Sequence, residues 1–476
     1  MIEPIELSRL IAAEVAGIPA HDEDLSSLMR RAATLVVLDD DPTGTQTVHD
    51  VPVVTAWDES DLSWAFDQRA PGFFVLTNTR ALPPAEADAR VSEIAARCRR
   101  IARERGIEVV FASRGDSTLR GHFPVEIDAV EKGSARPHDA VVLVPAYPDA
   151  GRITVESTHW LAEAGLARPV GSTEYARDAT FGYRESSLPA WVEEKTRGRI
   201  PASEVETIGL ETIRRGGRSA VDTRLREIGA GGVVVVDAAR EDDLRVVAAA
   251  ALTAEAAGRR LVYACGPGFV RARLGQRRAD PVTDAQLAQL LDGSGRHGLV
   301  IAGSHVPRTT RQLEQLVARV PIAVFELDLD AIGDRGALLA LSSRITDALE
   351  HRPVLVQTPR SVRVVADPGR SLQIAREVSH ALVEVARGVF DRTRPAYLIA
   401  KGGITSSDIA TDALEMRRAH VAGTMLPGIV SIWRAVDGRT PELPYVVFAG
   451  NVGGDGDLAH VVERWESALA RSRGDR

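Results

Sequence analysis

Short apolar runs alternate with longer amphipathic stretches along most of this chain. Runs of valine, isoleucine and leucine without polar alternation indicate strands that are buried on both faces of a sheet. Between them lie stretches with helical periodicity, such as 85–103 and 242–257. This alternation is typical of α/β folds with mostly parallel sheets flanked by helices. The strands expected in the first half are Thr34–Leu38, Gly72–Leu76, Val109–Ala112, Ala140–Val144, Gly232–Val236 and Leu261–Ala264.

The pattern weakens in two places. Residues 151–215 are less regular and indicate an insertion, and the helical residues of 274–296 are interrupted by proline and glycine. Because 476 residues exceed what one core normally serves, we expect two domains. The predicted bounds are 1–33 for a helical lead-in, 34–275 for a first domain, 276–297 for a linker and 298–476 for a second domain.

Composition excludes several classes of protein. The chain is 44% hydrophobic and 26% charged, which is ordinary for a globular protein, and its net charge of −8 argues against a broad nucleic-acid-binding surface. Cys98 and Cys265 are too few for a disulfide framework or a cysteine-based metal site. There is no apolar run of about 18 residues and no basic, apolar leader, so we expect a cytoplasmic protein without a membrane partner.

Polar side chains follow the predicted strands of the first half. Because ligands bind at the carboxyl ends of strands in open α/β sheets, these positions are the first candidates for a site. Asp39, Asp40 and Asp41 come directly after the first strand, followed by Thr43. Adjacent carboxylates repel one another, and a cation or a hydroxylic ligand would offset the repulsion. A capped turn is the alternative explanation.

Arginines follow the neighbouring strands, at Arg80, Arg114, Arg120 and Arg152. A guanidinium group binds carboxylate or phosphate in a bidentate manner. Asp116 lies among them in sequence and is either a general base or an ion-pair partner. Structural pairing is the commoner explanation for any one Arg–Asp pair, whereas convergence at neighbouring strand ends favours a pocket for a small, polyhydroxylated carboxylic acid.

The second half repeats one pattern: a short apolar strand, a loop of glycines and hydroxyls, and an amphipathic helix. Glycines let a backbone approach a ligand closely, and a helix start presents unpaired N–H groups. The three loops therefore predict a site for the phosphates of a nucleotide. Their candidate residues are Ser304 in the first loop, Lys401, Gly402, Gly403, Thr405 and Ser406 in the second, and Gly450, Asn451 and Gly453 in the third.

Several familiar motifs are absent. We find no Walker A loop, no Gly-x-Gly-x-x-Gly after a first strand and no Gly-x-Ser-x-Gly elbow. His122, His159 and His305 lack metal-ligand spacing and are better explained as loop or core histidines. Phosphoryl transfer needs phosphate positioning, a divalent cation and a base. The chain offers phosphate loops in one half and candidate bases and cation ligands in the other, so we expect an active site in a cleft between two domains.

The motifs, taken in order, resemble those of the four-carbon acid sugar kinases, and the resemblance extends from about Val36 to Val461. It implies ATP- and Mg²⁺-dependent phosphorylation of a hydroxyl of a tetronate such as threonate, erythronate or 3-oxo-tetronate, with an acid-sugar-binding first domain and a nucleotide-binding second domain. The matching segments are Asp40–Gly44, Asp116–Gly121, Pro145–Arg152, Gly303–Ser304, Gly402–Ser406, Pro427–Gly428 and Gly450–Gly453.

Three positions depart from the family pattern. His122 stands where asparagine is frequent, Ile404 stands where an acidic residue is common, and Phe448-Ala449 replaces a Lys-Ser pair. The last change removes a cation from the third loop.

From the residues and the resemblance together we assign candidate roles. Asp116 is the first candidate for the general base. Asp40 and Asp41 are the second candidates and would hold substrate hydroxyls or Mg²⁺. The full set of ligands of a metal ion is not assigned. Predicted substrate-binding residues are Thr43, Arg80, Arg114, Ser117, Thr118, Arg120 and Arg152, and Gly428 joins the predicted ATP-binding residues of the three loops.

Two alternatives from other classes stay open. One is a non-catalytic sensor of an acid sugar and a nucleotide, and the other is an NAD-dependent hydroxyacid dehydrogenase. A homodimer is compatible with the sequence.

Overall fold

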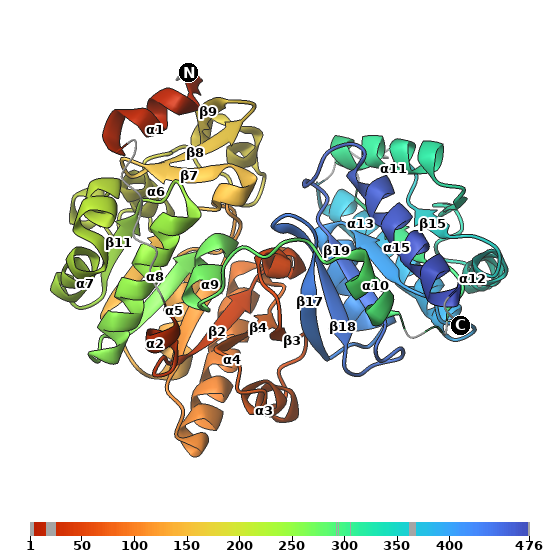
Figure 1. The fold of residues 1–476 in the computed structure, drawn as a ribbon, viewed down its shortest axis with the longest axis horizontal. Helices are drawn as coiled ribbons and strands as arrows, with labels where there is room; N and C mark the ends of the chain where they lie inside the picture. The colour runs from red at the N-terminus through yellow and green to blue at the C-terminus, as the bar shows by residue number, and fades with distance from the viewer. Residues whose placement is uncertain are drawn as a thin grey trace. The chain divides into compact units, whose positions relative to one another are not determined.

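The chain forms two compact units, each described here by itself (Figure 1). The first comprises Met1–Thr47 and Trp57–Arg278, and the second comprises Val48–Ala56 and Ala279–Arg476. The short segment Val48–Ala56 therefore belongs to the second unit, although both of its neighbours in sequence belong to the first. The computed structural model describes residues 4–15, 25–291, 293, 295–304, 306–360 and 368–474, so that His305 lies outside the described residues.

A parallel sheet in the order β10-β11-β6-β12-β5-β2-β4 forms the centre of the first unit. Its strands are almost entirely buried, as the absence of polar alternation predicts. The strands expected from the sequence are all present, and β5 runs two residues further than expected. The bounds are β2 Thr34–Asp39, β4 Gly72–Leu76, β5 Val109–Arg114, β6 Ala140–Val144, β10 Glu206–Ile208, β11 Gly232–Val236 and β12 Leu261–Cys265.

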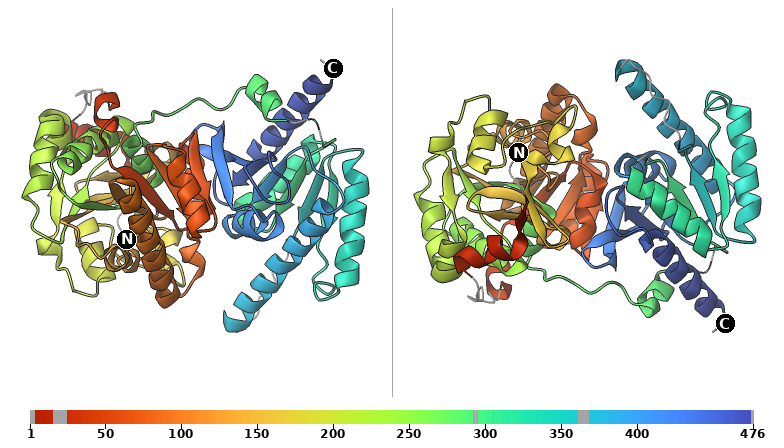
Figure 2. Two further views of the ribbon diagram at one scale, coloured as in Figure 1. Left: turned by 90° about the horizontal axis from the view of Figure 1, so that it is seen from below. Right: turned by 90° about the horizontal axis from the view of Figure 1, so that it is seen from above.

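Helices cover both faces of this sheet (Figure 2). Helices α4 and α5 pack against each other, as do α7 and α8. Crossovers between parallel strands are normally right-handed, which places the two pairs on opposite faces. The helix bounds in this part are α3 Glu59–Asp67, α4 Pro84–Arg105, α5 Val125–Ser134, α7 Gly217–Glu227, α8 Glu241–Ala256 and α9 Pro267–Arg273, with the short α2 at Ser26–Met29.

The predicted insertion contains a second, antiparallel sheet in the order β1-β9-β8-β7. The sequence pattern did not indicate it, because tight turns join its short strands. One of these turns holds Glu156 and Ser157 at φ 50° and 57°, a conformation that non-glycine residues seldom adopt. The bounds are β1 Ile5–Glu6, α1 Leu7–Val15, β7 Arg152–Val155, β8 Thr158–Glu163, β9 Leu166–Pro169 and α6 Leu188–Lys195.

The sheet of the second unit has the order β3-β17-β18-β19-β16-β13-β15-β14. The strands from β19 to β14 are parallel, whereas β18, β17 and β3 extend the sheet in antiparallel pairs. The bounds are β3 Val51–Val54, β13 Leu299–Ala302, β14 Ala323–Glu326, β15 Val354–Gln357, β16 Leu398–Lys401, β17 Arg418–Leu426, β18 Ile429–Ala435 and β19 Pro444–Phe448. Both units thus have mostly parallel sheets flanked by helices, as expected.

Helices α10, α11 and α15 pack together, as do α12 and α13 (Figure 2). Leu287, Leu316 and Trp465 come from the first three helices and are fully buried in one core. The predicted linker 276–297 therefore includes a helix, α10, that contributes to the core of the second unit. The bounds are α10 Asp284–Leu290, α11 Pro307–Arg319, α12 Arg335–Leu349, α13 Pro368–Phe390, α14 Gly403–Asp408 and α15 Asp457–Gly474.

The helix after the second loop begins earlier than the sequence predicted. The sequence pattern placed Thr405 and Ser406 in the loop before the helix, but α14 starts at Gly403 and continues into a π-helical turn over Ile409–Ala413. Gly402 has φ 123°, which lets the chain turn from β16 directly into the helix. Thr405 and Ser406 therefore lie in the first helical turn rather than in a loop.

Candidate functional site

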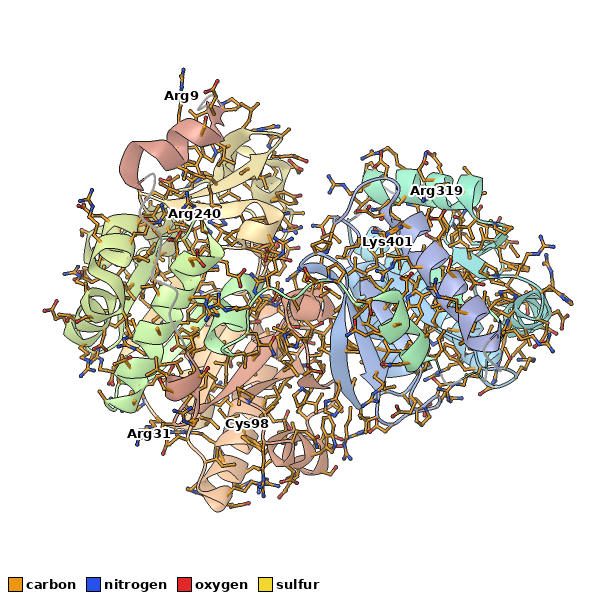
Figure 3. All side chains as sticks on the ribbon, in the orientation of Figure 1. Arg9, Arg31, Cys98, Arg240, Arg319 and Lys401 are labelled. Atoms are coloured by element: carbon orange, nitrogen blue, oxygen red, sulfur yellow. The ribbon has the colours of Figure 1, made fainter. Side chains whose placement is uncertain are left out.

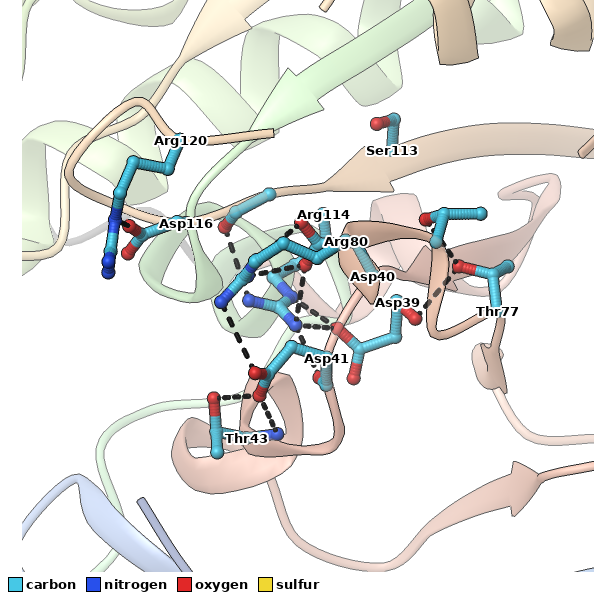
Figure 4. A network of polar contacts seen from close by, with 12 residues as sticks. Asp39, Asp40, Asp41, Thr43, Thr77, Arg80, Ser113, Arg114, Asp116 and Arg120 are labelled. Atoms are coloured by element: carbon cyan, nitrogen blue, oxygen red, sulfur yellow. Dashed lines mark hydrogen bonds and ion pairs between the residues drawn. The ribbon is translucent and has the colours of Figure 1, made fainter. Parts of the chain in front are cut away.

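Two strand ends of the first unit bring an aspartate and an arginine together. Asp39 ends β2 and pairs in register with Arg114, which ends β5. The Arg114 guanidinium contacts Asp39 Oδ1 through Nε and Nη2, and Nη2 also donates to the Asp41 carbonyl at 2.5 Å and lies 3.2 Å from Asp40 Oδ1. Its side chain is 3% exposed. Arg114 thus contacts all three aspartates of the acidic turn (Figure 4).

Arg80 binds the same turn from another direction (Figure 4). It donates to both oxygens of Asp40, at 3.0 and 2.6 Å, and Nη1 donates to Asp41 Oδ2 at 3.2 Å. Thr43 donates to the other Asp41 oxygen through N, at 2.8 Å, and through Oγ1, at 2.5 Å. The cations that offset the repulsion of the acidic turn are therefore two guanidinium groups of the protein.

Gly44 permits this close packing. A Cβ atom at Gly44 would collide with the Asp39 carboxylate and with Arg114 Nε. The glycine of the Asp40–Gly44 motif is thus required by the close packing of a buried ion-pair cluster.

The loop after β5 carries a second pair. Asp116 Oδ2 accepts from Arg120 Nε at 2.5 Å and from Thr118 Oγ1. Burial alone would raise the pKa of Asp116, but the charges of Arg120 and Arg80 outweigh it and hold that pKa below its usual range. Asp116 is therefore an ionised carboxylate at neutral pH.

A pocket in the first unit brings together Asp40, Asp116 and Arg120. Its apolar wall includes Leu119 and Trp191. It thus places a guanidinium and carboxylates next to apolar surface, as expected for a site that binds a small polar molecule.

The pocket also contains two residues that were not assigned a role from the sequence, His122 and Glu126. Glu126 is 4% exposed and accepts from Ser113 Oγ and from Thr79 Oγ1, each at 2.5 Å. Burial raises its pKa. Sequence reasoning missed Glu126 because it lies in the first turn of α5, past the loop that follows the strand. The only signal was an acidic residue in a first helical turn.

Three other predicted substrate-binding residues, Ser117, Thr118 and Arg152, are not among the residues that line this pocket. Ser117 and Thr118 offer their carbonyl groups to His159 Nε2, at 2.8 Å, and to the Tyr183 hydroxyl, at 2.6 Å. Arg152 begins β7 and its Nη1 donates to the Ala150 carbonyl. Of the predicted substrate-binding set, Arg120 is a residue that lines the pocket, whereas Arg80, Arg114 and Thr43 surround the acidic turn.

In the second unit the three predicted phosphate loops meet at Ser304. They follow β13, β16 and β19, which are neighbours in the sheet. A Cβ atom at Gly450 would lie 2.6 Å from Ser304 Oγ, and one at Gly402 would lie 3.2 Å from Ser304 Cβ. Thr309 Oγ1 ties the loops together through Ser304 Oγ, at 3.2 Å, and the Gly450 carbonyl, at 3.1 Å. The loops approach so closely that only small residues fit between them.

The remaining predicted nucleotide-binding residues lie at the same end of the sheet. Gly403 is the first residue of α14, and a Cβ atom at Gly303 would collide with Thr405 Oγ1. The pairing of Ser431 with Val447 places the β17–β18 turn, which contains Gly428, at the carboxyl end of β19. Asn451 accepts through its carbonyl from Arg308 Nη1 at 3.0 Å, and Gly453 has φ 80°.

Two polar residues of the second loop are buried instead of facing outward. Lys401 is 0% exposed, and its Nζ donates to the Ala449 carbonyl at 2.6 Å and lies 4.1 Å from the centre of the Phe448 ring (Figure 3). Burial lowers its pKa well below the ordinary value. Ser406 is also 0% exposed and donates to the Ala400 carbonyl at 3.0 Å. In this structure the Lys401 side chain fastens the second loop to the third, whereas the Ser406 side chain fastens the start of α14 to its own strand, β16.

No dedicated metal site is evident in the described part of the chain, where no group of three or more histidine, cysteine, aspartate or glutamate side chains is arranged to hold an ion. The carboxylates of the acidic turn are bound by Arg80 and Arg114. The residues present therefore do not form a cage for Mg²⁺, which proteins often bind through one or two carboxylates together with substrate phosphates. Within the described residues, no helix is long and apolar enough to span a membrane.

Comparison with known proteins agrees with the division into two functional halves. Residues 35–273 match the model of a sugar-binding N-terminal domain, and residues 299–458 match that of a nucleotide-binding C-terminal domain. A D-erythronate kinase of Heliobacterium modesticaldum is 27% identical over 404 residues, which cover 80% of this chain and 83% of that protein. A D-threonate kinase of Salmonella typhimurium is 27% identical over 403 residues, which cover 82% of this chain and 88% of the relative.

A solved structure shares the fold. Haemophilus influenzae protein HI1011 superposes with a TM-score of 0.59 at 19% identity, covering 91% of this chain and all of that one. The two domain models together match most of the chain, in the order that the motifs predict. The chain belongs to the four-carbon acid sugar kinase family.

Proposed function

We propose that this protein transfers the γ-phosphoryl group of ATP to a hydroxyl of a four-carbon sugar acid such as erythronate, threonate or 3-oxo-tetronate. The observation that carries the proposal is the pocket in which Asp116, Arg120 and Asp40 face one space. An anionic substrate needs a guanidinium to bind its carboxylate, and the acceptor hydroxyl needs a carboxylate to take its proton. The pocket offers both. The two kinase relatives act, by their names, on acids of this class.

In this proposal Arg120 binds the substrate carboxylate through the guanidinium nitrogens that Asp116 does not use. Asp116 accepts the proton of the hydroxyl, since its depressed pKa keeps it ionised at neutral pH. Arg80 and Arg114 hold Asp40 and Asp41 in place. Asp40 then offers its carboxylate to substrate hydroxyls.

The loops around Ser304 are the proposed site for ATP. Backbone N–H groups and hydroxyls of Ser304, Gly402, Gly403, Thr405 and the 450–453 loop would hold its phosphates. We propose that Mg²⁺ arrives with the nucleotide. The prediction that sugar and nucleotide meet in a cleft stays a prediction, as do the domain bounds 34–275 and 298–476, a homodimer and a cytoplasmic location.

The proposal is tested by measuring ADP release from ATP and Mg²⁺ across erythronate, threonate and 3-oxo-tetronate, with five- and six-carbon sugar acids as controls. Turnover on a four-carbon acid, with a phosphate monoester seen by ³¹P NMR, supports the proposal. Turnover on a five- or six-carbon acid alone would show that the reaction is correct and that the substrate is longer than proposed. ATP binding without turnover on any acid would favour the sensor, and NAD reduction would favour the dehydrogenase.

A further inference from the structure

One arginine of the second unit reaches the loops at Ser304 from a fourth strand. Arg360 follows β15, the neighbour of β13 in the sheet. Its Nη2 donates to the Ser304 carbonyl at 2.7 Å and to Thr310 Oγ1 at 3.0 Å, and its Nε lies 3.3 Å from the same hydroxyl. The guanidinium is thus fixed against the loop that joins β13 to α11.

The acceptors of Arg360 are a carbonyl and a hydroxyl, so they do not neutralise its charge. Among the described residues, no carboxylate lies within ion-pair distance of it, and Glu326 acts on its charge only from further away. Within the described part of the chain, the buried Nη1 of Arg360 has no hydrogen-bond partner, although the side chain as a whole is only part-buried. A covered guanidinium donor without an acceptor is unfavourable, because it has lost water and gained nothing in return. An anionic oxygen is the acceptor that it lacks.

Two other cations of this region already have acceptors. Lys401 is buried against the Ala449 carbonyl and the Phe448 ring. Arg308 donates from Nη1 to the Asn451 carbonyl. By contrast, Arg360 combines a fixed position beside Ser304 with a donor that has no partner.

From these contacts we infer that Arg360 is a nucleotide-binding residue, whose guanidinium edge binds a phosphate of the nucleotide held by the loops at Ser304. The inference rests on the proposed function, which it deepens by assigning the cation that binds the phosphate. A bound phosphate oxygen gives Nη1 its acceptor and gives the charge of Arg360 a counter-charge. The hydrogen bonds of Nε and Nη2 to neutral acceptors orient the guanidinium group for that contact.

The experiment measures dissociation constants of ATP, ADP and adenosine by calorimetry on the full chain, without sugar acid, for the wild type and for Arg360→Gln. We expect the constants for ATP and ADP to rise roughly 10- to 100-fold, as for the loss of one hydrogen bond to a charged group, while that for adenosine is unchanged. Arg360→Lys keeps the charge but lacks the planar guanidinium group. We expect its dissociation constants for ATP and ADP to lie between those of the wild type and those of Arg360→Gln. Arg352→Gln is the matched control, because Arg352 is exposed just before β15.

Two results would overturn the assignment. One is unchanged binding of ATP and ADP by Arg360→Gln, and the other is an equal loss for adenosine, which would show that Arg360 merely holds the loop. Failure of the wild type itself to bind any nucleotide is a separate result. It would overturn the proposed function, and the role of Arg360 with it.

Discussion

The neighbours of Asp116 keep its carboxyl group ionised. Arg120 and Thr118 bind the same oxygen, Oδ2, and the nearby charge of Arg80 adds to the stabilisation of the ionised form. The depressed pKa makes Asp116 a weak base in the free protein. This is compatible with phosphoryl transfer, in which positioning and charge stabilisation contribute most of the catalysis.

Replacing Asp116 by asparagine tests its role as the proton acceptor. We expect kcat with the best sugar acid to fall ~10²- to 10⁴-fold, because a general base contributes about this much, while the dissociation constant of ATP is unchanged. Steady-state kinetics and calorimetry give the two values. Asp67→Asn is the control, since Asp67 forms an exposed ion pair with Arg105. Full kcat in Asp116→Asn would assign the proton to another group.

Arg80 is expected to matter for stability as well as for activity. Arg80→Ala removes the guanidinium that donates to both carboxylates, those of Asp40 and Asp41, and leaves Arg114 as the remaining cation of the turn. Loss of one partner from a buried ion-pair cluster typically costs ~3–5 kcal/mol. Urea denaturation followed by circular dichroism measures the free energy of unfolding. Arg105→Ala removes an exposed pair and should cost about 0–1 kcal/mol. Equal losses in the two variants would contradict the view that the acidic turn is held by Arg80.

Among the elements, the insertion is tied to the pocket by a histidine. His159 of β8 is 0% exposed, and its Nε2 must carry a proton because its partner, the Ser117 carbonyl, can only accept. Nδ1, 3.0 Å from Thr154 Oγ1, then accepts from that hydroxyl. The ring is thus neutral and bridges β7 to the loop that carries Asp116. Burial lowers the pKa of His159 to about 4.

This bridge predicts a pH dependence of stability. The pKa of His159 in the folded protein lies below its ordinary value of 6.5. The contribution of the neutral ring to the free energy of unfolding is therefore fully present above pH 6.5, and it is lost as the pH falls toward 4. We expect a loss of ~3 kcal/mol over this window, which follows from the size of the pKa shift. Denaturation curves of the wild type and His159→Gln at several pH values measure it. The wild type should lose more stability than the variant, whereas the exposed control His351→Gln should follow the wild type.

The strand ends show how far sequence reasoning reaches at this scale. Parallel strands end at one edge of a sheet, so Asp39–Asp41, Arg80 and Arg114 could be predicted to converge, and they do. What they contact could not be predicted, since hydrophobic patterning does not specify which arginine pairs with which carboxylate. Lys401 followed a strand and was expected to face a ligand. Its burial depends on Phe448, which lies on the neighbouring strand β19.

Arg360 was missed for a different reason. The strand β15 was not among those expected from the sequence, so the residues that follow it did not stand out as candidates for the site. Glu126 was missed because it lies inside a helix. That Arg360 and Glu126 lie beside the candidate sites follows only from the three-dimensional arrangement of the strands and helices.

In the molecule as a whole, the least predictable feature is β3. It pairs in antiparallel fashion with β17, with Val54 opposite Arg418 and Val51 opposite Val421. Thr55 reinforces the pairing through the Arg417 carbonyl, which accepts from its backbone N–H at 3.0 Å. Local patterning cannot reveal a partner this far away in the sequence. The predicted first domain, 34–275, is continuous in sequence and therefore includes residues 48–56.

The pairing predicts how a fragment behaves. Residues 279–476 expressed alone lack β3, which leaves β17 as an unpaired edge that invites association. We expect the fragment to self-associate in multi-angle light scattering and to bind a synthetic peptide of residues 48–56, as measured by fluorescence polarisation. A peptide with Val51→Lys and Val53→Lys is the control. A monomeric fragment that ignores the native peptide would show that β17 does not need this partner.

The same strand constrains how the protein is made. Translation proceeds from the N-terminus, and the segment that becomes β3 leaves the ribosome long before β17: Thr55 and its partner Met416 are 361 residues apart. The first unit has all of its chain once Arg278 has emerged, and N-terminal domains commonly fold first during synthesis. Its fold must therefore leave residues 48–56 available as a loop throughout the synthesis of the second half. The second unit is thus complete only when the newly synthesised β17 pairs with β3, a segment that was synthesised almost at the beginning.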